Sequence, residues 1–178
     1  MKRFITSNTP DTQILFENFG VTVYLAQILE GCMQSIIVAA ELDGRIEFDR
    51  KKDLRAKDWD DDLLQVCLNP MIQVLKKNQK QGDTEDFYAM LDNANQARNL
   101  LVHRFFLENS TDLINQSGRR SINDSLGRLY LIISKALCAA KALRSAIYTE
   151  WGVTEEQVRK HVENLKMLYG DDDENAEQ

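Results

Sequence analysis

The chain has 178 residues, of which 43% are hydrophobic and 28% charged, values typical of a soluble globular protein rather than a disordered or fibrous one. Its 8 glycines and 2 prolines are too few for the many tight turns of a β-sandwich or barrel. The net charge of −6 argues against nucleic acid as a partner. However, residues 171–178 hold five acids and no base, so residues 1–170 are nearly neutral and can carry a local basic patch.

The sequence contains no segment that we interpret as a targeting signal or a membrane span. The basic residues of MKRF are not followed by an apolar stretch, and the longest unbroken apolar runs have five residues, whereas a span needs about 20. We therefore expect a soluble, cytoplasmic protein with no membrane association. Residues 1–170 are expected to form one helical domain, and residues 171–178 a disordered acidic tail.

The first half of the chain predicts one long helix and two short ones. Apolar residues recur at three- and four-residue spacing over residues 12–40, the pattern of a long helix that is buried on more than one side. Gly44 follows as a candidate left-handed cap. Residues 41–62 are densely charged with both signs and predict a solvated loop. Short helices are expected over 60–68 and 70–77.

The second half predicts two further long helices, over 84–109 and 121–151, separated by the polar stretch NSTDLINQSG. Thr154 and Gln157 have the spacing of a capping box, which predicts a last helix ending at Gly170. No segment alternates like a strand. The predicted fold is therefore all-α, a helical bundle of three long helices plus two or three shorter ones.

The cysteines and histidines are too scattered to form a metal site. Cys32, Cys67 and Cys138 are far apart in the sequence, and we interpret them as small buried apolar side chains rather than disulfide partners. The only two histidines are His103 and His161, and the latter is expected at the surface of a charged helix. Neither a structural metal nor a cofactor is therefore predicted.

The helix over 84–109 carries an unusual set of polar groups away from its core stripe. Residues spaced by three and four positions form one ridge: Asp92, Asn95, Asn99, His103 and Phe106. In a regular helix Arg98 lies about 140° around the axis from His103, although its long side chain can curl toward the imidazole. One helix thus presents an amide, an imidazole and a cation within reach of one another.

These groups match the needs of RNA cleavage without a metal ion. A base must accept the proton of the ribose 2′-OH, an acid must protonate the leaving 5′ oxygen, and a cation must stabilise the crowded phosphate. Histidine, with an unperturbed pKa of about 6.5, suits either proton step, and arginine binds phosphate oxygens in a bidentate way. Because one histidine can hardly perform both steps, a two-fold dimer with two histidines in one cleft is attractive.

The segment RNLLVH, Arg98 to His103, resembles the R-x4–6-H signature of HEPN domains, small all-α bundles that include metal-independent endoribonucleases of toxin–antitoxin, CRISPR and antiviral systems. In that family a polar residue, often asparagine, commonly follows the arginine, as Asn99 does here. The resemblance implies that Arg98 and His103 are catalytic with Asn99 in support, that the site is composite in a homodimer, and that a protein partner inhibits it.

One position departs from a subgroup of that family. In HEPN toxins silenced by a nucleotidyltransferase antitoxin the pattern extends to R-x4-H-x-Y, and the tyrosine is modified. Here Phe105 occupies this position and has no hydroxyl to accept AMP. Control by that chemistry is therefore not expected, although a phenyl ring is compatible with cleavage.

Three further arginines are candidates for binding RNA phosphates: Arg104, beside the histidine, and Arg119 and Arg120, near the start of the helix over 121–151. For the latter two a plain solvated loop or helix start explains the sequence equally well.

Two functional hypotheses remain open at this point. The first is an endoribonuclease with a HEPN-like fold, a toxin or defence effector. The second is a non-catalytic helical interaction or regulatory module that uses the ridge as a dimer seam or peptide groove. The charge of −6 favours the second, and the composition of the ridge favours the first.

Overall fold

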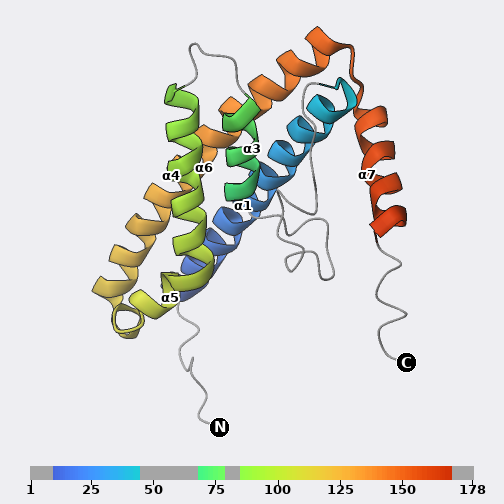
Figure 1. Cartoon of the computed structure of the whole chain (residues 1–178). Helices are drawn as coiled ribbons and strands as arrows, with labels where there is room; N and C mark the ends of the chain where they lie inside the picture. Colours follow the sequence, from blue (N-terminus) through green and yellow to red (C-terminus); the bar gives the residue numbers. More distant parts are fainter. Residues whose placement is uncertain (1–9, 45–67, 79–84, 170–178) are drawn as a thin grey trace. The chain divides into compact units, whose positions relative to one another are not determined.

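The computed structural model describes residues 10–44, 68–78 and 85–169, and every regular element within these ranges is a helix (Figure 1). The predicted all-α class is therefore confirmed. In chain order the elements are α1 (Pro10–Leu42), α3 (Leu68–Asn78), α4 (Glu85–Asn99), the π-helix η2 (Leu100–Arg104), α5 (Phe105–Glu108), the 3₁₀-helix η3 (Asp112–Ile114), α6 (Gln116–Trp151) and α7 (Glu155–Tyr169).

The helix ends are set by the local signals that the sequence carries, with two exceptions. Gly44, just beyond α1, adopts a φ of 68°, the left-handed conformation expected of a glycine cap. The helix expected over 121–151 begins earlier, at Gln116, and the one expected over 70–77 begins at Leu68. The short helix predicted over 60–68 falls almost entirely outside the described residues, as does the acidic tail.

The chain divides into two compact units, Met1–Leu29 with Thr84–Cys138, and Glu30–Asp83 with Ala139–Gln178. The long helices α1 and α6 each contribute one part to each unit. We describe the two units separately below. The expectation of a single domain over 1–170 stays a prediction.

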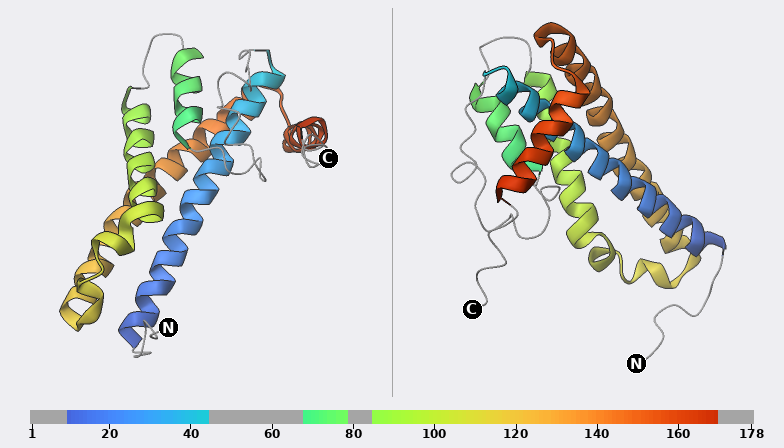
Figure 2. Two further views of the ribbon diagram at one scale, coloured as in Figure 1. Left: turned by 60° about the horizontal axis from the view of Figure 1, so that its bottom comes forward. Right: turned by 90° about the vertical axis from the view of Figure 1, so that its right-hand side faces the viewer.

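In the first unit α1 and α6 run in the same direction. Side chains with the same sequence offset meet between them: Gln116 Nε2 donates to Asp11 Oδ2 at 2.9 Å, and Asn18 Nδ2 donates to Asn123 Oδ1 at 3.0 Å. Figure 2 shows the two helices from two further sides. The unit buries one apolar side of each of its long helices, including Leu15, Leu91, Ala94, Leu101, Phe105, Ile122, Leu126 and Ile133.

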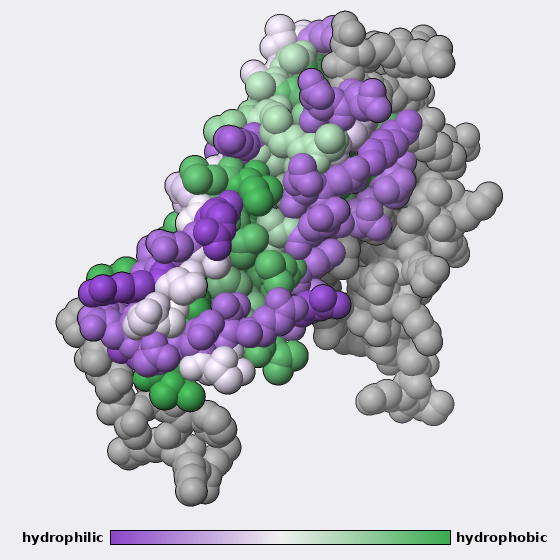
Figure 3. Space-filling model, turned by 90° about the vertical axis from the view of Figure 1, so that its left-hand side faces the viewer, coloured by the Kyte–Doolittle hydropathy of each residue, from purple (hydrophilic) through white to green (hydrophobic). Residues whose placement is uncertain are grey.

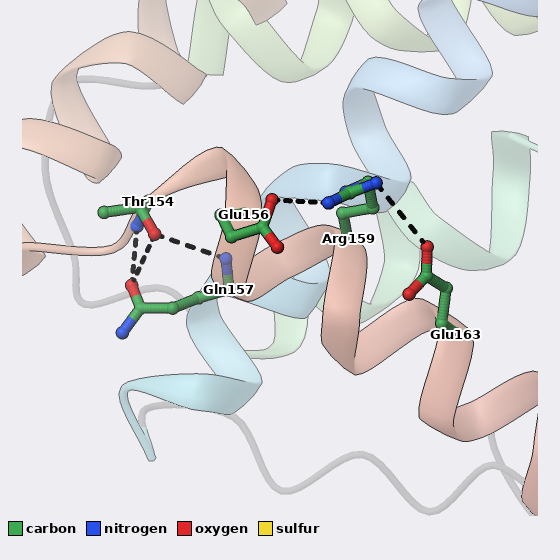
Figure 4. A network of polar contacts seen from close by, with 5 residues as sticks. All are labelled: Thr154, Glu156, Gln157, Arg159 and Glu163. Atoms are coloured by element: carbon green, nitrogen blue, oxygen red, sulfur yellow. Dashed lines mark hydrogen bonds and ion pairs between the residues drawn. The ribbon is translucent and has the colours of Figure 1, made fainter.

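The second unit packs α3 and α7 with the end of α1 and the end of α6. Ala40 and Val74 are buried together, and Leu75 and Trp151 pack against them. Within α7 the predicted capping box is confirmed. Gln157 N donates to Thr154 Oγ1 at 3.2 Å, and Thr154 N donates to Gln157 Oε1 at 2.8 Å (Figure 4).

His161 attaches α7 to the last turn of α1 in this unit. Its Nε2 lies 3.4 Å from Glu41 Oε2, and the side chain of His161 is 27% exposed, so it lies at a packed edge rather than freely at the surface as predicted. Nε2 itself is shielded from solvent and the pair is poorly aligned for a hydrogen bond. We therefore regard it as an ion-pair contact that forms when the imidazole is protonated.

The cysteines divide into different environments. Cys32 is buried, as predicted, and burial raises the pKa of its thiol, an effect that nearby Arg144 and Lys141 partly offset. The prediction was wrong for Cys138, which is exposed. It follows the buried Leu137 in α6, and one step of about 100° around the helix takes its side chain to the solvent. Cys67 lies outside the described residues.

The segment Asp11–Leu42 is long and apolar enough to cross a membrane by length and composition alone. Half of its most apolar window is buried against other parts of the protein, as in the core helix of a soluble protein, which passes the same test. The finding is therefore weak evidence for a span.

Candidate active site

The helix predicted over 84–109 is interrupted by a π-turn in its second half. α4 ends at Asn99, residues Leu100–Arg104 form the π-helix η2, and α5 continues from Phe105. At the junction Arg104 has a φ of −130° and a ψ of −19°, outside the helical region. Widened turns of this kind are rare and often occur at functional sites.

The π-turn brings Arg98 and His103 together. Arg98 Nη1 lies 3.4 Å from His103 Nε2 and donates to Asn99 Oδ1 at 3.3 Å. The contact is the one expected if the long Arg98 side chain curls toward the imidazole. Backbone hydrogen bonds in a π-helix join residues five apart, so the turn between the two residues is wider than that of the regular α-helix for which about 140° was expected.

The three side chains lie at the surface of the first unit. Arg98 is partly buried, whereas Asn99 and His103 are exposed. His103 is therefore not a core histidine with an interior partner. Because a guanidinium can only donate, this contact is a hydrogen bond only in the tautomer in which Nε2 is the acceptor and Nδ1 carries the proton.

The rest of the predicted ridge is only partly a polar face. Asp92 and Asn95 are partly buried. Phe106 was predicted to point away from the core, and this was wrong: its ring lies 4.6 Å from that of Phe19 and 5.5 Å from that of Phe16, both in α1. The prediction assumed a regular helix through residue 106, whereas the π-turn and the non-helical Arg104 precede this phenylalanine.

The three arginines predicted to bind RNA have different surroundings. Arg104 is exposed and its Nη1 lies 3.7 Å from Glu108 Oε1, one turn along the helix. Arg119 Nη1 donates to the carbonyl oxygen of Leu113 at 3.0 Å and so ties η3 to the first turn of α6. Arg120 is exposed. Their contact with RNA stays a prediction.

The turn before α6 contains structural residues that the sequence analysis did not identify. Asn115 is the N-cap of α6: its Oδ1 accepts a hydrogen bond of 2.7 Å from Gly118 N. Gly118 is buried, and a Cβ placed on it would collide with the backbone of Asp112. The signal was present, since asparagine is among the preferred N-cap residues.

Comparison of the chain with protein-family models, with curated proteins and with solved structures finds no match. The resemblance to HEPN domains therefore depends on the residues of RNLLVH alone.

Proposed function

We propose that this protein is a metal-independent endoribonuclease with a HEPN-like fold and that Arg98, Asn99 and His103 form its active site. The observation that carries the proposal is the contact of 3.4 Å between Arg98 Nη1 and His103 Nε2 at the surface. The same Nη1 donates a hydrogen bond of 3.3 Å to Asn99 Oδ1. Contacts between charged or polar side chains at the surface contribute little to stability, so this convergence supports a role beyond holding the fold.

The arrangement suits cleavage by the 2′-hydroxyl of RNA. His103 Nε2 accepts the proton of that hydroxyl, the 2′ oxygen attacks phosphorus, and the bond to the 5′ oxygen breaks once that oxygen receives a proton. The products are a 2′,3′-cyclic phosphate and a 5′-hydroxyl. The guanidinium of Arg98 has five N–H donors and can turn from His103 to the phosphate when RNA binds, which frees Nε2 to act as the base. Asn99 restrains the guanidinium.

A second copy of the chain would supply the second histidine that the two proton transfers require. His103 can hold the base role or the acid role during one cleavage event, and the other histidine, His161, contacts Glu41 in the second unit. In the proposed homodimer the two-fold mate of His103 protonates the leaving oxygen. The resemblance further suggests a cytoplasmic toxin or defence effector that is silenced by an inhibitory protein partner.

The experiment is an RNase assay on the pure protein in EDTA, with variants matched in residue type. His103→Ala and Arg98→Ala are expected to lower the cleavage rate by about 100-fold or more, the usual contribution of a general acid or base. His161→Ala and Arg159→Ala are controls from α7 and should retain the wild-type rate. Cleavage that survives His103→Ala would exclude the proposed site.

The exposed apolar side chains support the alternative of a non-catalytic interaction module. In the first unit Val21 and Leu131 remain 52% and 57% exposed, and Figure 3 shows hydrophobic residues at the surface between rows of hydrophilic ones. This alternative predicts that a well-folded wild-type protein leaves several different RNAs intact in the same assay.

A further inference from the structure

Two consecutive phenylalanines after the π-turn both reach α1. The Phe105 ring lies 5.9 Å from that of Phe19, and the Phe106 ring lies 4.6 Å from Phe19 and 5.5 Å from Phe16. Phe105 is buried, with 2% of its surface exposed, and Phe106 is partly buried. Neighbouring residues of a regular helix point about 100° apart, so the two rings meet α1 from different directions.

The two rings come directly after the distorted backbone of the site. The π-turn ends at Arg104, whose φ and ψ lie outside the helical region, and Phe105 and Phe106 follow it. On the other side of the turn Leu101 is buried, with 1% exposed, and holds the preceding segment in the core. His103 lies between these two anchors and is exposed.

We propose that Phe106 is a positioning residue for His103: its packing on Phe16 and Phe19 maintains the π-turn that holds the imidazole against Arg98. If the ring is removed, the segment can relax to a regular α-helix, in which Leu101 and Phe105 still share the core side. His103 then moves away from Arg98. The expected effect on cleavage depends on the proposed function, whereas the effect on the position of His103 does not.

The test measures the imidazole directly. Nitrogen-15 NMR of the full-length protein reports which ring nitrogen of His103 carries the proton. In the wild type we expect the proton on Nδ1, because a hydrogen bond from Arg98 requires Nε2 as the acceptor. In Phe106→Ala we expect a shift to the Nε2-protonated form that free histidine prefers, together with a fall in kcat of about 100-fold and little change in KM.

Two further variants separate positioning from a general loss of structure. Phe87→Ala removes another partly buried ring of the first unit, one that packs on Tyr88 at 5.6 Å, and should leave the His103 signals unchanged. Phe106→Leu retains apolar bulk and should restore the wild-type tautomer. If Phe106→Ala does not fold, Phe16→Ala removes one ring contact from the α1 side, and the same shift is expected.

The outcomes distinguish this inference from the proposed function. An unchanged His103 tautomer in folded Phe106→Ala, or in Phe16→Ala where the former does not fold, overturns the positioning role. A shifted tautomer in a protein whose wild type never cleaves RNA upholds the positioning role and removes the enzymatic proposal.

Discussion

Two glycines of α6 predict opposite effects of the same substitution. In a helix, alanine in place of glycine ordinarily stabilises by about 1 kcal/mol, because glycine loses more backbone entropy on folding. Gly127 fits that rule: it is exposed, and apart from the neighbouring residues and backbone of its own helix, no atom of the described residues lies within 4 Å of its Cβ position. Gly127→Ala should therefore raise the free energy of unfolding by about 1 kcal/mol.

Gly118 should behave in the opposite way. A Cβ there meets the carbonyl oxygen, carbonyl carbon and Cα of Asp112, which are backbone atoms that no rotamer change can move aside. Overpacking of this kind costs about 1–3 kcal/mol. Displacing the turn also weakens the hydrogen bond from Gly118 N to Asn115 Oδ1, and losing such a cap costs about 1 kcal/mol. After the gain in helix propensity, the net destabilisation is about 1–3 kcal/mol.

The assay is urea denaturation followed by circular dichroism, with both variants and the wild type measured side by side. We expect a lower midpoint for Gly118→Ala and a higher one for Gly127→Ala. If Gly118→Ala proves as stable as the wild type or more stable, the close approach of η3 to α6 is refuted.

Three other predictions concern the cysteines, the proposed dimer and the last helix. Burial raises the pKa of the Cys32 thiol, so a smaller fraction of it is thiolate at pH 8. In a Cys67→Ser variant, a thiol reagent should therefore modify the exposed Cys138 first, and should modify Cys32 only after the protein unfolds. If His103→Ala protein is added to the wild type with RNA in excess over total protein, mixed dimers should form and the wild-type cleavage rate should fall. An unchanged rate would show that each copy of the chain cleaves RNA alone. Thr154→Ala should lower the free energy of unfolding by about 1 kcal/mol in the same urea assay, and an unaltered midpoint would show that the capping box contributes nothing.

The sequence was a good guide to the helices because their signals are local. Apolar residues at helical spacing identified the three long helices, and Gly44 and the pair Thr154 and Gln157 marked ends that the structure has. The start of α6 was placed too late, since the cap Asn115 lies in a polar stretch that also looks like a loop.

The site could be predicted in composition but not in geometry. Ala94, Leu101 and Phe105 have spacings that a regular helix satisfies, so their pattern gave no sign of a π-turn. The turn lies next to Phe106, whose ring packs on Phe16 and Phe19 of α1. This contact joins segments that are far apart in the sequence. Consequently the π-turn between Arg98 and His103 was visible only in three dimensions, although the reach of the arginine toward the imidazole could be predicted from the sequence.

The most direct test of the central claim is the chemical nature of the cut RNA end. We would incubate an end-labelled RNA with the wild-type protein and with His103→Ala in EDTA, and identify the 3′ end of the product by mass spectrometry. Cleavage that leaves a 2′,3′-cyclic phosphate and disappears in His103→Ala is the predicted result. Intact RNA with the well-folded wild type, or an equal amount of cyclic phosphate with His103→Ala, would contradict the proposed site.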